Sequence, residues 1–477
     1  MPVEPDCDQP AAAEPASGVP AAEETPAAAA SVPVANLPTA ADFACRLPRQ
    51  HYSLGAIGWF VELVLSAPCS QRAAATIVSW VTQLWPGCQE APSANAGRTW
   101  LFRLGLYELT CPKEAADDWV WLVDHTVQLG SHKGLLVVGL RLADWQAQPR
   151  PLEHQDVRLL HLEPMEHSDG QAMQRELEKV VAVTGIPRAI VSDGGSDVKK
   201  GIALFRQAHP TTDYVYDITH KVALLLKKEL EADPDWERFI TASNLARRGL
   251  TLTTAGFLVP PALKSKARYM NVDCLVEWGV KVLRFLDHPR EVPGAPVDAR
   301  LVEGRLGWLR RYRRRLTQWS ELLAVAQTAE HYVRHQGWQA AAPDELRDCL
   351  QPLARSAGSR RLKNHLLQFA AEQAAAAQPG ERLVGSTEVL ESLIGKYKSL
   401  QALHGGHGMT RTILAVGAIV GRRCLDTVRA ALGHVTNRHV HDWCQQHLGL
   451  TLQARRQHAF APEQNPPPLL PACKPSF

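Results

Sequence analysis

The sequence predicts an α/β protein whose central sheet has five strands of mixed direction, with helices on its faces. Three apolar segments between residues 116 and 165 follow one another with no helical pattern between them. Helical and strand patterns then alternate up to residue 230, whereas residues 231–380 contain no convincing strand pattern. The predicted element order is therefore β-β-β-α-β-α-β-α, a meander followed by crossovers. An all-α insertion interrupts this sheet domain, and a helical region precedes it.

The two ends of the chain differ in composition from the rest. Residues 1–42 form an acidic leader rich in Ala and Pro, which cannot bury enough apolar surface to fold. The first forty residues contain six acids and no Lys or Arg, so the formal net charge of +3 leaves +9 on the remainder. This charge is a modest indication of a polyanionic partner. Residues 456–477 are rich in Pro and are predicted to be a flexible tail.

Composition also restricts the cellular setting. No run of eighteen apolar residues is present, so no transmembrane helix is predicted. The ten cysteines are scattered without a CxxC pair, which argues against a zinc ribbon and against a dense disulfide framework. We therefore expect reduced thiols, an intracellular location and no membrane partner.

Residues 43–115 have the pattern of a short helical domain. The segments "LGAIGWFVELVLS" and "QRAAATIVSWVTQLW" are separated by a Pro-Cys-Ser break. A third helix is expected to begin after Ser93 or Asn95, either of which can act as its N-cap, and it carries Arg98 and Arg103. Short helices joined by small-residue turns are typical of a helix-turn-helix, so we expect this region to bind DNA through these two arginines. A plain helical bundle is the alternative.

Residues 116–230 supply all five strands and the first part of the predicted sheet domain. The strand segments are "DWVWLVDHTVQL", "SHKGLLVVGLRLAD", "VRLLHLEPM", "AIVSD" and "DYVYDI". The helix segments are "DGQAMQRELEKVVAVTG", "DVKKGIALFRQA" and "HKVALLLKKEL". Asp197 stands at the start of the second of these helices, where we expect it to act as the N-cap.

Two acids lie in otherwise apolar strand segments. Asp124 is in the first strand, and Asp193 ends the fourth. In this element order the first and fourth strands commonly lie side by side and parallel, so the two carboxylates would face each other at one edge of the sheet. Two buried carboxylates repel, and a divalent cation removes that repulsion. Ligand sets made only of oxygen suit Mg²⁺ or Mn²⁺ rather than Zn²⁺.

The remaining segments are predicted to be helical. Residues 231–380 form the insertion, residues 381–400 a further helix of the sheet domain, and residues 401–455 a C-terminal helical region. The clearest amphipathic helix of the insertion carries the cluster "RRYRRR", which is either a solvated helix face or a contact to the DNA backbone. The cluster contains three arginines that we place among the candidate DNA contacts: Arg310, Arg311 and Arg314.

Five residues, taken in order, carry a family resemblance: Asp124 in "VDHT", Asp193 in "VSDGG", Asp217 and His220 in "YDITHK", and Glu391 in "STEVLESLIGKYK". Their order and setting resemble the DDE transposases of the ribonuclease H-like fold, and most of all the bacterial insertion-sequence and Mutator-like enzymes. In that family a helical insertion separates the last strand from the helix that carries the final acid, and a Cys/Asp-x-x-His pair follows the second Asp. The resemblance covers the two parts of the sheet domain, with a plausible insertion between them.

The resemblance implies a ribonuclease H-like catalytic domain that cleaves DNA and transfers the cleaved strand by metal-dependent phosphoryl transfer. In such a domain Asp124, Asp193 and Glu391 would hold two Mg²⁺ ions roughly 3.5–4 Å apart, and Mn²⁺ can substitute. The implied partners are double-stranded DNA, as transposon end repeats and as target, and further copies of the chain in a dimer or larger synaptic assembly. The implied location is the bacterial cytoplasm, at the nucleoid.

The resemblance also assigns supporting residues. Asp217 and His220 would orient DNA or brace the site, and Lys398, two helical turns beyond Glu391, would hold a DNA phosphate. Glu388 is the alternative for the final acid, although the helix dipole is a sufficient reason for an acid in the first turn of a helix. The Tyr and Arg that some relatives place before this glutamate are absent, which separates the chain from that subgroup.

Two other functions remain open. A transposase-derived protein that binds DNA without cutting it would share the same fold and sequence pattern. A haloacid-dehalogenase-like phosphatase would use Asp124 as its nucleophile, but Thr126 occupies the position of its second acid and Glu391 has no role in it. Magnesium-dependent strand transfer separates the first of these alternatives from an active enzyme.

Overall fold

The structure is a computed structural model that describes residues 38–67, 69–84, 90–129, 132–262, 272–288, 298–403, 409–421, 424–449, 456–457 and 459–461, without the side chains of residues 126–129 and 403. Most of the predicted leader (1–42) and tail (456–477) lies outside these described residues. The residues from Pro38 onward form one compact unit. Among the described residues, none of the helices combines the length and the apolar character that crossing a bilayer requires.

Five strands form one mixed sheet, and their order in space is β3-β2-β1-β4-β5. Their bounds are Trp119–Leu129 (β1), His132–Arg141 (β2), Arg158–Met165 (β3), Ala189–Ser192 (β4) and Asp213–Tyr216 (β5). β2 is antiparallel to both β1 and β3, and β4 is parallel to both β1 and β5. This is the ribonuclease H-like arrangement, and it confirms the predicted fold class, including the parallel pairing of the first and fourth strands.

The end of the second strand segment, expected to be extended, instead begins a short helix, α5 (Leu142–Ala147). Beyond Arg141 the strand has no partner in β1, because β1 begins at Trp119 and Trp119 already pairs with Arg141. Asp118 holds the turning chain through both its carbonyl and its carboxylate oxygens. β2 therefore ends where its antiparallel neighbour β1 begins.

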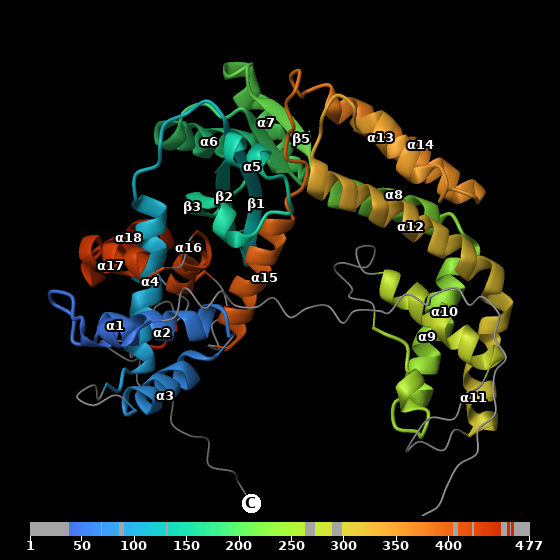
Figure 1. Cartoon of the computed structure of the whole chain (residues 1–477), viewed down its shortest axis with the longest axis horizontal. Helices are drawn as coiled ribbons and strands as arrows, with labels where there is room; N and C mark the ends of the chain where they lie inside the picture. Colours follow the sequence, from blue (N-terminus) through green and yellow to red (C-terminus); the bar gives the residue numbers. More distant parts are fainter. Residues whose placement is uncertain are drawn as a thin grey trace, which may run out of the picture. The chain divides into compact units, whose positions relative to one another are not determined.

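Helices cover both faces of the sheet (Figure 1). The covering helices are α6 (Gly170–Thr184) and α7 (Ser196–Ala208) on one face, and α8 (Ile218–Glu231) and α15 (Glu388–Leu403) on the other. Leu177 of α6 and Phe205 of α7 share a core with Trp121. Val120 packs in the opposite core, with residues of α8 and α15. Because successive strand residues point to opposite faces, Asp124 lies on the α8 and α15 side.

Asp197 does not cap α7, contrary to the prediction. The N-cap residue is Gly195, and Asp197 lies in the first turn. Its Oδ2 accepts hydrogen bonds from Lys133 Nζ at 2.7 Å and from Ser168 Oγ at 2.6 Å. Burial alone would raise the pKa of Asp197, but these two partners outweigh it and lower the pKa to about 2. The carboxylate ties α7 to β2 and to the loop before α6, which a local capping rule does not foresee.

The described part of the insertion contains helices and no strand, as predicted. Its α-helices are α9 (Pro234–Leu250), α10 (Asp273–Asp287), α11 (Ala299–Leu306), α12 (Arg313–Gln336), α13 (Ala342–Leu350) and α14 (Ala357–Ala374). Its core is aromatic, with the ring centroids of Trp236 and Trp319 4.9 Å apart. The chain re-enters the sheet domain through a backbone bridge, in which the N–H of Trp338 donates to Leu383 O at 2.7 Å and the N–H of Leu383 to Trp338 O at 2.8 Å.

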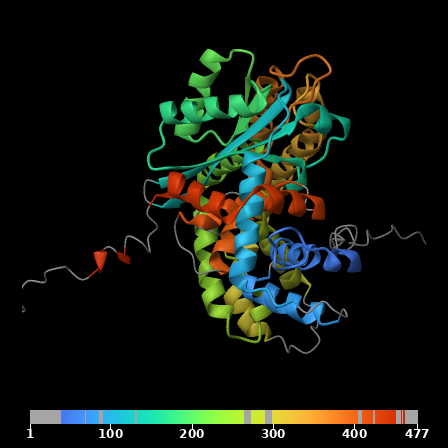
Figure 2. The ribbon, with the colours of Figure 1, turned by 90° about the vertical axis from the view of Figure 1, so that its left-hand side faces the viewer.

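The N-terminal and C-terminal helical regions pack against each other. Their helices are α1 (Ala40–Ala44), α2 (Leu54–Leu65), α3 (Gln71–Thr82), α4 (Ala94–Thr110), α16 (Ala415–Ile419), α17 (Leu425–His434) and α18 (Asn437–Leu448). Figure 2 shows α4 crossing the C-terminal helices. Phe102 and Leu106 of α4 share a core with Leu414, Val440 and Cys444. The two regions that the sequence presents as separate therefore bury each other's apolar side chains.

Arg103 has a structural role in place of the DNA contact expected above. It is buried, and its Nε donates to Val435 O and its Nη2 to Leu432 O, both at 2.6 Å. Both carbonyls lie at the C-terminal end of α17, where helical carbonyls lack partners within the helix. Burial lowers the pKa of the Arg103 guanidinium from its usual value. Arg103 thus joins α4 to α17 and is not free to face DNA.

α4 and α16 cross at two glycines. A Cβ on Gly105 would lie 1.6 Å from the carbonyl oxygen of Leu414, and a Cβ on Gly417 would lie 2.5 Å from Gly105 O. The two backbones are therefore in direct contact, and only glycine leaves room for that approach.

We expect Gly105→Ala to destabilise the protein by about 1–3 kcal/mol, because the added methyl group must push α16 away from α4. Gly304→Ala is the matched control, since Gly304 also lies within a helix, α11, and no atom lies within 4 Å of its Cβ position. That change should be neutral or stabilise by up to about 1 kcal/mol. Thermal unfolding of both variants measures the difference, and equal midpoints would show that the α4–α16 contact is not tight.

Candidate active site

Asp124 and Asp193 lie at the same edge of the sheet. β1 and β4 are parallel, and Val123 pairs with Ser192. Asp124 directly follows Val123 and Asp193 directly follows Ser192, so the two acids lie side by side. Burial raises the pKa of Asp124 to about 7, and the negative charge of Asp193 adds to the shift. The structure thus brings together the two acids that the predicted strand order places side by side.

A tight turn after β4 shapes the surroundings of Asp193. Gly194 has a φ of +76°, which favours glycine, and a Cβ there would lie 2.3 Å from the ring of Tyr216. The N–H of Gly195 donates to Asp193 Oδ1 at 2.9 Å. Among the described residues no group donates to Oδ2 of Asp193, which leaves that oxygen available to a cation.

Asp217 is fully buried and joins two distant parts of the site. It is the N-cap of α8, and its Oδ2 accepts from both the backbone N–H and Nδ1 of His220, each at 2.8 Å. Its Oδ1 accepts from the backbone N–H of Thr387, also at 2.8 Å. Thr387 is the residue before α15, so Asp217 fixes where that helix begins. Glu391 follows one turn later on the same helix.

Glu391 faces this pair. Its Oε1 lies 3.6 Å from Nδ1 of His220, too far for a good hydrogen bond, and is buried without a hydrogen-bond partner. Burial raises the pKa of Glu391. Burial by itself would lower the pKa of His220. The hydrogen bond from His220 to Asp217 and the negative charges of Asp217 and Glu391 outweigh burial and raise this pKa to about 9.

Glu388, the alternative for the final acid, has a different environment. Its Oε2 forms an ion pair with Nε of Arg334 at 2.9 Å, and its side chain is 46% exposed. Glu391 is 34% exposed and has the unpaired oxygen described above. Between the two, Glu391 is the acid that has a buried oxygen without a hydrogen-bond partner among the described residues.

Asp124, Asp193 and Glu391 do not form a closed ligand set. Among the described residues, the clusters whose donor atoms all lie within 4.8 Å of one another include Glu391 with Asp217 and His220, but neither Asp124 nor Asp193. Glu391 is still close enough to raise the pKa of Asp124. The cationic His220 attracts the carboxylate of Glu391, whereas the carboxylates of Asp124 and Asp193 repel it. The three predicted ligands are all carboxylates and one of them has an unpaired buried oxygen, so the site fits a hard divalent cation.

The insertion contributes two residues that sequence reasoning missed. Glu330 and Arg334 of α12 line a cavity of about 210 Å³ together with Glu391, Thr219 and Asp273. Burial, followed by neighbouring acids, raises the pKa of Glu330 to about 7, although Arg334 acts in the opposite direction. No motif marks these residues, because only the packing of α12 on α8 brings them to the site.

The predicted DNA-contacting cations differ in availability. Arg310 forms an ion pair with Glu303, and Arg98 donates to Asn95 Oδ1 at 2.5 Å. In the cluster around Arg310, Arg313 and Arg315 also pair with acids of the insertion. The exposed cations with no ion-pair partner in the described part of the chain include Lys398, Arg311 and Arg314.

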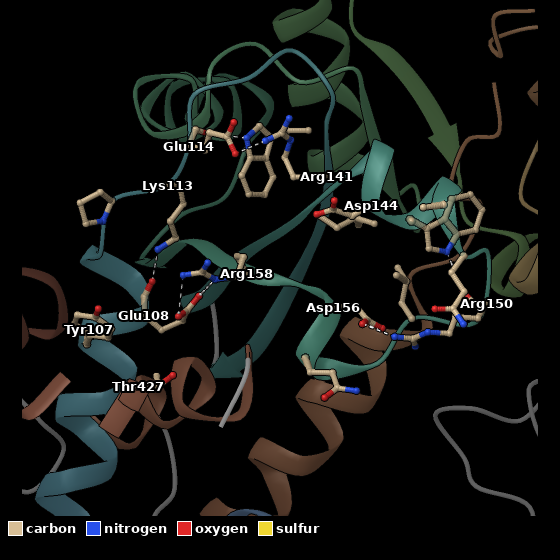
Figure 3. Close-up of a pocket in the computed structure, with 18 of the residues that line it drawn as sticks. Tyr107, Glu108, Lys113, Glu114, Arg141, Asp144, Arg150, Asp156, Arg158 and Thr427 are labelled. Atoms are coloured by element: carbon tan, nitrogen blue, oxygen red, sulfur yellow. Dashed lines mark hydrogen bonds and ion pairs between the residues drawn. The ribbon is translucent and has the colours of Figure 1, made fainter. Parts of the chain in front are cut away.

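A larger cleft, of about 900 Å³, lies at the opposite end of the strands, near Trp119 and Arg141 (Figure 3). Its arginines are already paired: Arg141 with Asp118 and Glu114, Arg150 with Asp156, and Arg158 with Glu108. Lys113 donates to backbone carbonyls. These cations are neutralised within the protein, so this cleft is a weaker candidate for an anionic ligand than its size suggests.

Comparisons with known proteins place the chain near no sequence family. No protein-family profile matches it, and no curated protein matches its sequence. One solved structure with a similar fold is the Drosophila P element transposase strand transfer complex, at 10% sequence identity and a TM-score of 0.38. The match covers 78% of this chain and 92% of that chain.

We expect Glu330→Gln to stabilise the protein above pH 7 and to have little effect near pH 4.5. With a folded pKa of about 7 and an unfolded value near 4.3, folded Glu330 keeps a proton that the unfolded chain has lost, so the free energy of unfolding falls as pH rises between these values. Glutamine does not titrate, so the gain should reach about 3–4 kcal/mol at pH 8. Thermal melts from pH 4.5 to 8.5 measure it, and a pH-independent difference would contradict the assignment.

Proposed function

We propose that the protein is a DNA transposase that cleaves and joins DNA strands by metal-dependent phosphoryl transfer. The observation that carries the proposal is the position of the acids: Asp124 lies within β1, Asp193 follows the end of the adjacent parallel strand β4, and Asp217 holds the start of the helix that bears Glu391. The ribonuclease H-like strand order supports it. The antiparallel meander that follows Asp124 fits a haloacid-dehalogenase-like phosphatase badly, and that reading gives Glu391 no role.

In this proposal Asp124, Asp193 and Glu391 hold two Mg²⁺ ions, or Mn²⁺ in their place. Bound divalent cations would neutralise the scissile phosphate and activate the attacking water or 3′-hydroxyl. Asp124 must lose its proton for this, because its pKa of about 7 keeps it partly neutral at physiological pH. His220 remains cationic, with a pKa of about 9, and stabilises Glu391 until that carboxylate becomes a ligand. Asp217 braces His220 and α15 and is a positioning residue.

The proposed DNA surface uses the exposed cations. Lys398 lies on the same helix as Glu391, two turns along, where it can hold the phosphate of a DNA end. Arg311 and Arg314 offer backbone contacts from the insertion, and Arg98 from α4, in a region that we propose to act as a helix-turn-helix. Arg310 and Arg103 contribute less or not at all, because each is engaged within the protein.

The finer assignment is to the bacterial insertion-sequence and Mutator-like group, acting in the cytoplasm at the nucleoid. Binding two transposon ends and a target at once requires a dimer or a larger assembly of the chain. The second candidate is a transposase-derived protein that binds DNA without cutting it. It would share this fold and these acids, and metal-dependent cleavage of DNA separates it from an active enzyme.

We expect the affinity for Mg²⁺ to rise with pH and to level off above about pH 8. The metal-free protein binds a proton at Asp124 with a pKa of about 7, and this proton must leave, so affinity at pH 6 should be about tenfold lower than at pH 8. Isothermal titration calorimetry between pH 5.5 and 8 measures the change. Glu330→Gln is the matched control, because Glu330 titrates in the same range but is not a proposed ligand. If the affinity of Glu330→Gln for Mg²⁺ no longer depends on pH, the proton that metal binding displaces is on Glu330 and not on Asp124.

The decisive assay compares Asp193→Asn, Glu391→Gln and Glu388→Gln with the wild type on linear DNA that carries the sequences flanking the gene, in Mg²⁺ or Mn²⁺. We expect the first two variants to bind the DNA but to lose cleavage by more than about 100-fold, because each lacks a metal ligand. Glu388→Gln should cut, since Glu388 pairs with Arg334 and is not a proposed ligand. Binding without cleavage by the wild type supports the DNA-binding alternative. Loss in Glu388→Gln alone would make Glu388 the third acid.

A further inference from the structure

A second cluster of side chains that can bind metal lies where β3, α6 and α18 meet. His161 and Glu163 are on β3, Glu176 is on α6 and His447 is on α18. Nε2 of His161 lies 2.8 Å from Oε2 of Glu176, and Nδ1 of His447 lies 2.8 Å from Oε2 of Glu163. The donor atoms of His161, Glu163 and Glu176 all lie within 4.8 Å of one another. Two imidazoles and two carboxylates thus converge from three separate elements.

The strand geometry explains how these side chains meet. His161 and Glu163 are two residues apart, so both side chains leave the same face of β3, which is an edge strand of the sheet. Their partners in β2 are Val137 and Leu135, which belong to the core beneath α6 and α7. α6 covers this face and brings Glu176 to it.

The two glutamates are largely buried, and a lysine pairs with one of them, Glu176. The side chains of Glu163 and Glu176 are 19% and 14% exposed. Lys179, with its Nζ 2.8 Å from Glu176, is the nearby lysine in this cluster, and its own side chain is 58% exposed. The imidazoles of His161 and His447 add positive charge only when they are protonated. A divalent cation between the carboxylates would remove their repulsion at neutral pH.

This cluster is chemically and spatially distinct from the proposed catalytic site. Asp124 lies on the opposite face of the sheet, with α8 and α15. The catalytic acids offer only oxygen, whereas His161 and His447 offer nitrogen. Imidazole nitrogen favours Zn²⁺ and related transition metals over Mg²⁺.

We propose that His161, Glu163, Glu176 and His447 bind one zinc ion that joins β3, α6 and α18. Tetrahedral zinc with bonds of about 2.0–2.2 Å separates its donor atoms by about 3.3 Å. The first three donors therefore need only small side-chain movements, whereas His447, which lies outside this group of three and contacts Glu163 at 2.8 Å, would have to turn further to reach the same ion. Four protein ligands leave no open position, which makes the site structural. The ion would hold α18 against the edge strand, and this role does not depend on transposase activity.

The test is a cobalt titration of the full-length protein after chelation and dialysis. Co²⁺ occupies zinc sites and absorbs visible light strongly when it is four-coordinate, but only weakly when six oxygens surround it. We expect one equivalent of Co²⁺ to give the strong spectrum, and one equivalent of Zn²⁺ to abolish it. Excess Mg²⁺ should leave the spectrum unchanged, because Mg²⁺ competes only for carboxylate sites such as that at Asp124.

Variants identify the ligands. His161→Ala and His447→Ala should each remove the strong spectrum. His209→Ala is the matched control, because His209 Nε2 lies 2.9 Å from Glu178 of the same helix α6 and belongs to no cluster of three donors among the described residues. Asp193→Asn should also keep the spectrum, which separates a failure of this proposal from a failure of the catalytic one.

Circular dichroism of the metal-free variants shows whether they fold. If a histidine variant does not fold, Glu163→Gln is used in its place to test the same site. A strong spectrum that survives both His161→Ala and Glu163→Gln overturns the proposal, and so does one that disappears in Asp193→Asn. A wild-type protein that gives only the weak spectrum overturns it as well, and makes the cluster two hydrogen-bonded His–Glu pairs.

Discussion

The site depends on the buried carboxylate of Asp217. An ionised carboxylate without access to water is costly unless hydrogen bonds replace its hydration, and Asp217 accepts three, two from His220 and one from Thr387. Asp217 directly follows β5, whereas Thr387 directly precedes α15. This one side chain therefore joins the two parts of the sheet domain that the insertion separates. The backbone N–H of Ile218, which donates to Gly385 O at 3.0 Å, adds a second link between the same two segments.

The local charge balance around this link is unusual. Burial and neighbouring acids raise the pKa values of Asp124 and Glu330 to about 7, while Asp217 raises the pKa of His220 to about 9 against the effect of burial. The site thus lowers its negative charge by holding protons. Such a site is poised to exchange those protons for cations, because each ligand carboxylate is more favourable ionised once positive charge is beside it.

Much of this could be predicted from the sequence, because its signals are local. Continuous apolar runs identify the strands, as expected for strands buried on both faces, and the strand order places Asp124 and Asp193 together. Local rules fail where a side chain finds a distant partner. Asp197 looks like a helix cap but binds Lys133, and Arg103 looks like a surface cation but binds carbonyls of α17. Glu330 gives no signal at all, because only the packing of the insertion on α8 brings it to the site.

The crossing of α4 over the C-terminal helices has a consequence for how the protein is made. Arg103 lies 332 residues before its partner Val435, so at about 5–20 residues per second a ribosome needs roughly 20–70 s to deliver that partner. During this interval the apolar face of α4, with Phe102 and Leu106, has not yet met Leu414 and Val440. This apolar face therefore stays exposed to other proteins until synthesis is almost complete. A chain that is released early or truncated before α16 never covers it and is expected to aggregate.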